Sequence, residues 1–424
     1  MKSTSFGRFT LSNGLRVVVA PDDTASVVAV SVHYDVGYRS EPEGRSGFAH
    51  LFEHMMFQGS ESVPKGDHPR LVQTAGGVLN GTTDRDFTVY FDVVPREAMA
   101  TVLFLEADRM RAPLLGEAEL GNQVAVVKEE IRGTMLGNPY GRFPVRLSSV
   151  LYDTFPNAHD GWGDFESLEK ATLDDCAAFF DTYYCPGNAV LTIAGEVTIG
   201  QAEELVVRYF DDVPARDVPA RQSFDEPVPT SARRGDESDP RVPLLAVAAG
   251  YRLPDPSQID DYLAYLVLGD VLTAGHGGRL QQRLVHREGL AIGVDAAPLD
   301  GAFFARHPDT YSISAYAAPG VSAEQILEVL DEELSGLAQH PPTVEEVTKS
   351  VMQWTTAVAA QCDDPAERVR GLGMFELLHG QAELLPRMPT RLAALTPEHV
   401  SNAAKALRPD SRAVLTLCPA GGPA

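Results

Sequence analysis

The segment GFAHLFEHMMFQG, residues 47–59, anchors the fold prediction, because it places two histidines and a glutamate within five positions of one apolar stretch. If the segment is helical, His50 and His54 lie four residues apart on one face, where both imidazoles can reach one metal ion. Glu53 lies at the edge of that face, free to accept a proton from an attacking water. The pattern HxxEH is the inverted form of the HExxH zinc-peptidase signature. The alternative is a helix that merely packs two histidines.

Composition narrows the class of protein. The chain has 424 residues, which is long enough for two or more domains, and its 44% hydrophobic content is typical of globular proteins. A net charge of −24 disfavours nucleic acid and anionic membranes as partners. The N-terminus has no signal-peptide pattern, and no segment approaches the roughly 20 apolar residues of a membrane span. The four cysteines form no CxxC pair, which favours reduced thiols in a cytoplasmic protein.

The first half of the chain alternates strand and helix patterns. Residues 9–20 read as two strands around the turn Ser12-Asn13-Gly14, and residues 27–36 read as a further strand. Residues 78–94 read as two strands joined near Asp84, and residues 189–194 as another. Amphipathic patterns predict helices at 64–75, 95–110, 117–135 and 172–184. His33 has no partner at ligand spacing, so we expect a packed or edge histidine of its strand rather than a metal ligand.

The second half repeats the first. Residues 244–253 resemble 28–37 at an offset of 216, and AVLT at 189–192 recurs at 413–416, an offset of 224. Residues 213–240, rich in Pro, Arg, Asp and Glu, read as a linker. We therefore predict an α+β fold with two homologous domains, 1–212 and 241–424, each a mixed or antiparallel sheet with helices packed on one face. The counterpart helix, 260–273, has no histidine, so only the first domain can hold the metal.

A zinc site that activates water normally has three protein ligands. The helix at 117–135 offers two candidates for the third, Glu129 and Glu130. Adjacent helical residues point about 100° apart, so only one of them can reach the metal.

These motifs resemble the pitrilysin/insulinase family of zinc peptidases (inverzincins), and within it the short-chain branch that includes the mitochondrial processing peptidase and bacterial paired zinc peptidases. The resemblance extends over essentially the whole chain and rests on HxxEH, on VVKEEIRG at 126–133, and on three further segments: GGVLNGTTDRDFTVY (76–90), YYCPGNAVLTIAGEV (183–197) and GGRLQQRLVHREGLA (277–291). It implies that His50, His54 and Glu130 are Zn²⁺ ligands and that Glu53 is the general base. Glu129 is then expected at the surface or beside the site.

The resemblance also implies how a peptide is held. The family's substrate edge strand corresponds to Asn80, Gly81, Thr82 and Thr83, although an ordinary turn and strand is the alternative reading. Some members carry a glutamate seven positions before the ligand glutamate, where this chain has Gln123. Glutamine there can hydrogen-bond near the metal but adds no charge, so we expect it to tune metal affinity.

One departure from the family concerns assembly. Members with a complete site carry an arginine and a tyrosine in their second half, and the matching positions here are His286 and Ile292. Arg287 can replace the arginine after a one-residue shift, but isoleucine cannot stabilise an oxyanion. The resemblance therefore implies the zinc-bearing subunit of a heterodimer, whose homologous partner supplies the arginine and tyrosine, with an active homodimer as the alternative.

The resemblance further implies that the two domains form half of a clam-shell chamber that admits extended peptides or leader segments. Two rival functions stay open at this stage. One is a non-catalytic scaffold or core-type subunit of the same fold, which would not need all four metal-site residues. The other is a metal hydrolase that acts on substrates other than peptides.

Overall fold

The computed structural model describes residues 6–420, which form two compact units. Unit 1 contains the chain up to Glu129, Gly161–Gln222 and Ala357–Met388, and unit 2 contains Glu130–Asp160, Ser223–Thr356 and the chain from Pro389. Each half of the chain thus contributes one segment to the unit built mainly by the other half. The sequence divides the chain into two domains, 1–212 and 241–424, joined by a linker at 213–240. These boundaries remain a prediction.

Sheet 1 belongs to unit 1 and has six strands in the order β1-β2-β6-β3-β5-β4. The β2–β6 pair is parallel and the other pairs are antiparallel. The predicted first hairpin is present, with Gly14 at φ 93° and the Asn13 side chain donating hydrogen bonds to the Phe210 and Val213 carbonyls. The strands are β1 (Gly7–Thr10), β2 (Arg16–Pro21), β3 (Val27–Tyr34), β4 (Val78–Thr83), β5 (Thr88–Pro95) and β6 (Ala189–Gly195).

Sheet 2 belongs to unit 2 and repeats this order without a counterpart of β1: β7-β11-β8-β10-β9. In sheet 1, Tyr34 pairs with Ala189, and in sheet 2, Gly250 pairs with Ala413. These pairs reproduce both offsets found in the sequence, so the register confirms the internal duplication. The strands are β7 (Arg233–Asp239), β8 (Ala246–Arg252), β9 (Ala291–Pro298), β10 (Thr310–Ala317) and β11 (Ala413–Pro419).

Helices account for most of the remaining described residues. The α-helices are α1 (Phe48–Met55), α2 (Asp67–Thr74), α3 (Met99–Arg111), α4 (Glu117–Glu130), α5 (Phe143–Leu151), α6 (Phe155–Ala158), α7 (Phe165–Glu169), α8 (Leu173–Tyr183), α9 (Ile199–Phe210), α10 (Ile259–Thr273), α11 (Ala323–Gln339), α12 (Val344–Asp363), α13 (Pro365–His379), α14 (Leu384–Leu392) and α15 (Pro397–Ala406). Two π-helical segments, η3 (Ile131–Leu136) and η6 (Gln281–Arg287), follow α4 and precede β9. Short 3₁₀ turns are η1 (Tyr38–Ser40), η2 (Arg96–Ala98), η4 (Pro186–Asn188), η5 (Gly275–Gly277) and η7 (Pro409–Ser411).

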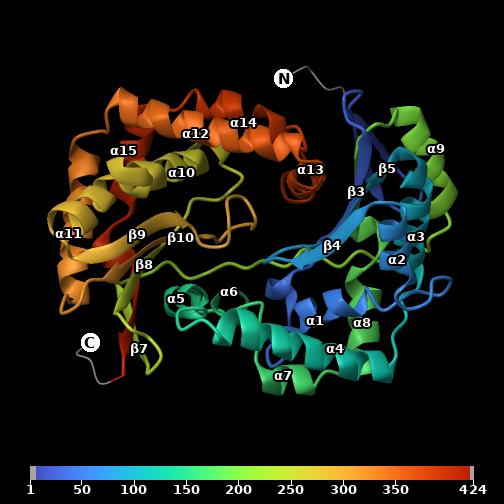
Figure 1. Ribbon diagram of the computed structural model, residues 1–424, viewed down its shortest axis with the longest axis horizontal. Coiled ribbons are helices and arrows are strands. Elements are labelled where there is room, and N and C mark those ends of the chain that lie inside the picture. The colour runs from blue at the N-terminus through green and yellow to red at the C-terminus, as the bar shows by residue number, and fades with distance from the viewer. Residues whose placement is uncertain (1–5, 421–424) are drawn as a thin grey trace. The chain divides into compact units, whose positions relative to one another are not determined.

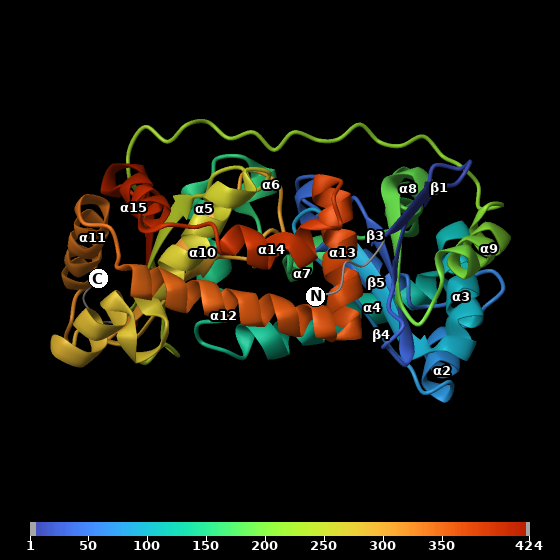
Figure 2. The same ribbon diagram turned by 90° about the horizontal axis from the view of Figure 1, so that it is seen from above.

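Sheet 1 has helices on both faces, whereas the sequence predicted them on one face. Figures 1 and 2 show α13 on the opposite side of the sheet from α3 and α9. Strands β3 and β6 are buried on both faces, so the sheet needs a second cover. The helix approaches closely through Gly373, where a Cβ atom would lie 2.3 Å from Nδ1 of His33. His33 is fully buried, as predicted, and α13 comes from the opposite half of the chain.

Unit 2 uses the reciprocal arrangement, because α5 from the first half packs on sheet 2. Phe143, Leu147 and Leu151 of α5 form one buried core with Ala248 and Leu415 of the sheet. The core of unit 2 is therefore built from side chains of both halves of the chain. Each half of the chain therefore contributes one helical segment to the unit built mainly by the other half.

The predicted linker is extended over residues 214–230, which form no helix or strand (Figure 2). Its end, however, is strand β7, which pairs in parallel with β11. The charged sequence RRGDESD hid this strand, because β7 lies at the edge of its sheet and alternates between half-buried and exposed residues. Across residues 6–420, none of the helices combines the length and the apolar character needed to traverse a bilayer.

Candidate metal centre and active site

Helix α1 begins at a defined point because its first backbone amides are capped by a buried carboxylate. Glu41 accepts hydrogen bonds from the backbone N–H of Gly47 at 2.9 Å and of Ala49 at 2.7 Å. A negative charge at a helix N-terminus satisfies free donors and complements the helix dipole. Gly47 has φ 85°, and a Cβ atom there would lie 2.7 Å from the carbonyl oxygen of Trp162. The start of the helix thus has two independent restraints.

The apolar face of α1 fixes which way the histidines point. Leu51, Phe52 and Met55 are completely buried, and the Phe52 ring packs against Phe179 and Tyr184 at 5.2 and 4.8 Å between ring centroids. Burying this face turns the histidine face away from the core. The half-buried imidazoles are therefore available to a ligand.

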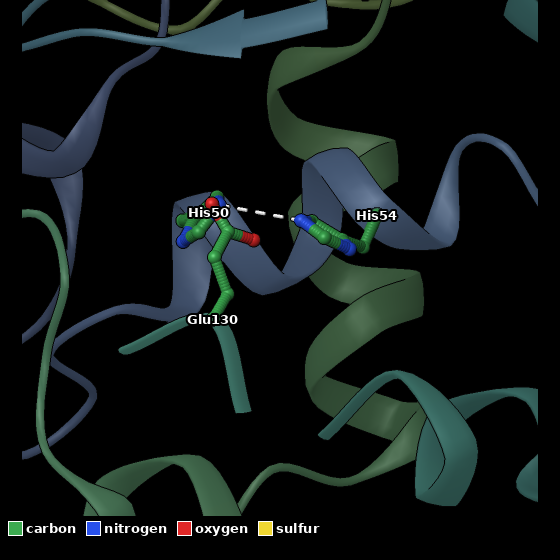
Figure 3. Close-up of side chains that lie close together, drawn as sticks. All are labelled: His50, His54 and Glu130. Carbon is green, nitrogen blue, oxygen red and sulfur yellow. Dashed lines mark hydrogen bonds between the residues drawn. The ribbon is translucent and has the colours of Figure 1, made fainter. Parts of the chain in front are cut away.

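His50 and His54 meet Glu130, as Figure 3 shows. The two histidine Nε2 atoms lie 3.3 Å apart, and ligand-type atoms of all three residues lie within 4.8 Å of one another. Glu130 is the last residue of α4, which belongs to unit 1 as far as Glu129. Glu129 is exposed, whereas Glu130 is half-buried. The structure therefore brings Glu130, rather than Glu129, to the histidines.

Helix α4 is tied to unit 1 close to Glu130. Lys128 forms an ion pair with Glu169 of α7 and lies 5.1 Å from the centre of the Phe165 ring. Near the other end of the helix, Glu119 pairs with Lys65 at 3.6 Å. These contacts fix α4 against residues of unit 1, up to the boundary between Glu129 and Glu130. The helix then widens into η3 directly after Glu130, a type of distortion common at functional sites.

The three side chains fit a zinc ion by their chemistry and spacing. Burial, together with the neighbouring His54, lowers the pKa of His50 to about 4, so this imidazole is neutral at neutral pH, as a metal ligand must be. Trp162 packs edge-on against the same ring at 5.5 Å. Two ligands of a tetrahedral zinc ion are separated by about 3.3 Å, which is the histidine separation found here. Two imidazoles and a carboxylate are a common set for a hydrolytic zinc site.

Glu53 is buried and held by the neighbouring strand β4. The hydroxyl of Thr83 donates a 2.6 Å hydrogen bond to Oε2 of Glu53. A Cβ atom at Gly81 would lie 3.1 Å from Oε1, so a side chain there would disturb the carboxylate. The sequence placed Thr83 and Gly81 in a peptide-binding strand, and it did not reveal that they also position Glu53.

A pocket of about 360 Å³ opens beside Glu53 and His54. Strand β4 comes last in the order of sheet 1, so among the described residues one of its edges carries no strand partner. Asn80 lines the pocket, and its side-chain oxygen accepts a bond from the Gly81 N–H. Gln123, which is buried, also lines it. The full lining is Glu53, His54, Phe57, Gln58, Pro69, Gln73, Leu79, Asn80 and Gln123.

The positions matched to the arginine and tyrosine lie in unit 2. His286 is exposed at the end of η6, where its Nε2 lies 3.2 Å from Nδ1 of His276 and the two rings stack. Ile292 lies on β9 with 60% of its surface exposed. Neither side chain is buried in a core, so both are available at the surface of this unit.

Three positioning residues were not recognised from the sequence as part of the site: Glu41, Trp162 and, in its contact with Glu53, Thr83. Glu41 acts on a helix that begins seven residues later, and Trp162 reaches His50 from a loop more than one hundred positions away. No spacing rule links such residues. Only Trp162 carried a weak signal, as one of the two tryptophans in the chain.

Two family profiles match the chain: "Insulinase (Peptidase family M16)" over residues 16–135 and "Peptidase M16 inactive domain" over residues 170–353. The chain belongs to the M16 peptidase family. The first match contains His50, Glu53, His54 and Glu130, and the second contains His286 and Ile292. The family resemblance found in the sequence is thereby confirmed.

Relatives of this M16 chain include named peptidases. It is 32% identical over 285 residues to the zinc protease PqqE of Helicobacter pylori, covering 66% of this chain and 64% of that protein. It is 24% identical to a probable mitochondrial-processing peptidase subunit beta of Arabidopsis thaliana, covering 93% and 75%. The crystal structure of a protease from Helicobacter pylori superposes with a TM-score of 0.90 at 26% identity, covering 98% of this chain and 100% of that one.

Proposed function

We propose that this chain is a zinc-dependent endopeptidase. The observation that carries the proposal is the convergence of His50, His54 and Glu130, beside a Glu53 carboxylate held by Thr83. Relatives named as zinc proteases support it. A scaffold without catalytic function would have no need for a buried, hydrogen-bonded Glu53 next to three potential ligands.

Zinc, when bound, supplies a Lewis acid that makes water more acidic and polarises the peptide carbonyl. Glu53 accepts a proton from the water while the water oxygen bonds to the carbonyl carbon. The hydrogen bond from Thr83 to Oε2 orients the Glu53 carboxylate for this step. Glu53 then donates it to the amide nitrogen as the C–N bond breaks, so the carboxylate is regenerated.

The peptide is proposed to bind along β4. Its unpaired edge offers backbone donors and acceptors at residues 80–83, which can align an extended peptide as an added strand. The adjoining pocket, with Phe57, Pro69 and Leu79 among its walls, is suited to one largely apolar side chain of the substrate. This arrangement favours peptides over other hydrolysable substrates.

We further propose that the active form is a heterodimer in which this chain is the zinc-bearing subunit. Ile292 cannot donate a hydrogen bond, and His286 is engaged with His276, so the expected arginine and tyrosine would come from a homologous partner. A relative named as a subunit of a processing peptidase supports pairing. A homodimer is the alternative. The clam-shell chamber and the use of leader segments as substrates belong to this proposal.

A cytoplasmic location is also proposed. All four cysteines lie in the described part of the chain and are free thiols: Cys176, Cys185, Cys362 and Cys418. Free thiols are compatible with a reducing compartment.

The test is cleavage of a peptide library by the zinc-loaded protein, alone and mixed with a homologous chain that carries the arginine and tyrosine. We expect weak or no cleavage by the chain alone and strong cleavage by the mixture, abolished when Glu53→Gln replaces the wild type. Strong cleavage by the chain alone would contradict the heterodimer. No zinc-dependent cleavage by either preparation would contradict the peptidase.

A further inference from the structure

Unit 1 contains a second cluster of metal-ligand side chains, separate from the candidate active site. His68 of α2, Asp92 of β5 and Glu106 of α3 converge there, with exposed fractions of 6%, 1% and 1%. They come from three different elements, and Figure 1 shows α2 and α3 on the same side of the sheet that contains β5. Imidazoles and carboxylates are rarely buried this completely without a partner.

Ligand-type atoms of the three residues all lie within 4.8 Å of one another. Nε2 of His68 lies 3.5 Å from Oδ1 of Asp92 and 3.7 Å from Oε1 of Glu106. These distances are too long for ordinary hydrogen bonds but close to the spacing of ligands around one ion. The histidine pair of the candidate zinc site has a similar separation, 3.3 Å.

The cluster also contains polar atoms that lack hydrogen-bond partners. They are Nε2 of His68, both carboxylate oxygens of Asp92 and Oε2 of Glu106, all inaccessible to solvent. An unsatisfied buried polar group costs about 1–3 kcal/mol, and a charged one costs more. Several such atoms facing one point therefore indicate that something is bound between them.

The protonation of His68 also supports a bound cation. Burial, and then the nearby Arg109, lower the pKa of His68 to about 4, so the ring is neutral at pH 7. If Nε2 carried the proton it should donate to a carboxylate, and no such bond exists in the structure. If Nε2 carries the lone pair, it faces carboxylate oxygens that repel it unless a cation lies between them.

Arg109 supplies a positive charge in contact with the cluster. It donates a hydrogen bond to Oε1 of Glu106, and its guanidinium carbon lies 4.2 Å from the centre of the Tyr90 ring. Glu106 can therefore keep Arg109 on Oε1 while it offers Oε2 to an ion. Burial raises the pKa of Asp92 to about 6 and also raises the pKa of Glu106, because ionised carboxylates are costly in the interior.

We propose that His68, Asp92 and Glu106 bind a second metal ion, a divalent transition ion such as Zn²⁺ or Mn²⁺, in a structural site within unit 1. One imidazole nitrogen and two carboxylate oxygens suit this class of ion. The ion satisfies the unpaired atoms and fastens α2 and α3 to strand β5. Pro69, next to His68, lines the pocket beside the active site, so the ion also supports the wall of that pocket.

The number of bound metal ions tests the proposal. Purified protein is saturated separately with Zn²⁺ or Mn²⁺ and dialysed, and metal is counted by mass spectrometry of the native chain and by elemental analysis. We expect two ions per wild-type chain, one in the His50→Ala/His54→Ala variant, and one in His68→Gln. One ion in the wild type, with the same content in His68→Gln and none in His50→Ala/His54→Ala, would overturn it.

A second measurement keeps the test informative if His68→Gln folds poorly. In the His50→Ala/His54→Ala background the active centre is removed, so added Zn²⁺ or Mn²⁺ should still raise the melting temperature, because the ion binds only the folded chain. The same variant with His68→Gln added should show no rise. An unchanged melting temperature in the first variant would overturn the second site, whereas the peptidase proposal would stand or fall on the wild-type cleavage assay alone.

Discussion

The two halves of the chain share a fold and differ in chemistry. Sheets 1 and 2 have the same strand order, and equivalent strands pair in the same register. Yet α1 carries His50, Glu53 and His54, whereas its counterpart α10 is buried along most of its length and has no histidine. Apolar periodicity, which both halves retain, is enough to specify the sheet and its helices. The candidate metal centre depends on a few additional side chains that the second half lacks at the matching helix.

The edge strands show the same contrast. Strand β4 supports Glu53 through Thr83 and Gly81, whereas the corresponding edge of sheet 2, β9, presents Ile292 to solvent. The edge strand of sheet 1 therefore contacts a buried carboxylate, whereas the edge strand of sheet 2 exposes an apolar side chain. The difference predicts where substitutions affect activity and where they affect stability alone.

Removing a proposed metal ligand should have the largest effect on activity, because it disrupts the site that distinguishes the first half of the chain from the second. His50→Ala or Glu130→Gln should lose bound zinc, and with it several kcal/mol of transition-state stabilisation, a decrease in kcat/KM of about a thousandfold or more. Zinc content and peptide cleavage are the measurements. The matched control is Glu129→Gln, which changes the adjacent exposed carboxylate and should retain both zinc and activity.

Replacing the proposed base should separate metal binding from catalysis. We expect Glu53→Gln to lower kcat by about 10²- to 10⁴-fold, because general base catalysis contributes about that much, while zinc content stays at the wild-type level. Elemental analysis and steady-state kinetics on one preparation check both parts. Activity close to wild type in this variant would exclude Glu53 as the base.

Gly373→Ala should test the helix that covers sheet 1. The added methyl group would lie 2.3 Å from the buried His33 ring, so we expect a loss of about 1–3 kcal/mol in the free energy of unfolding. The control is Gly336→Ala in α11, which meets nothing within 4 Å and should be neutral or stabilising. Chemical denaturation measures both. Equal stability of the two variants would show that α13 does not pack on sheet 1 as described.

Acid should destabilise unit 1 selectively, because His33 has Ala249 as its counterpart in sheet 2. Burial lowers the pKa of His33 to about 3. Because the pKa of His33 is lower in the folded chain than its value of about 6.5 in the unfolded chain, protonation favours the unfolded chain. The contribution of neutral His33 to the free energy of unfolding is complete above about pH 6.5 and is lost as the pH falls toward the folded-state pKa. Lowering the pH from 7 to 5 should therefore reduce the free energy of unfolding by about 2 kcal/mol. Denaturant unfolding of the His33→Gln variant should not show this loss of stability between pH 7 and pH 5. The same pH dependence in the variant and the wild type would contradict the role of His33.

Thr83→Val should give the smallest of these effects. It removes the hydroxyl that holds Oε2 of Glu53, and a hydrogen bond to a charged group is worth about 1.5–3 kcal/mol. We expect kcat to fall about tenfold with KM and zinc content little changed. Thr83→Ser keeps the hydroxyl and should retain most of the activity, so similar losses in both variants would argue against a positioning role.

Local patterns predicted much of this molecule. The hairpin at Gly14, the strands, helix α1 and the duplicated halves follow from short-range periodicity and turn residues, and the structure contains them. The choice of Glu130 over Glu129 rested on the family resemblance, and the structure brings Glu130 to the histidines.

Other features depend on contacts between residues distant in sequence. The exchange of α5 and α13 between the units leaves no local signature, because each helix has an ordinary amphipathic or apolar pattern. Strand β7 was concealed by its charged edge-strand sequence. The cluster of His68, Asp92 and Glu106 is spread over 39 positions without motif spacing, so only the folded chain shows it.

The most direct test of the proposed metal centre at His50, His54 and Glu130 is a crystal structure of zinc-loaded protein with diffraction recorded above and below the zinc absorption edge. The proposal predicts an anomalous peak bonded to Nε2 of His50, Nε2 of His54 and the carboxylate of Glu130, with Glu53 close by but not bound to it. Zinc-loaded crystals with no peak between these three side chains would contradict it.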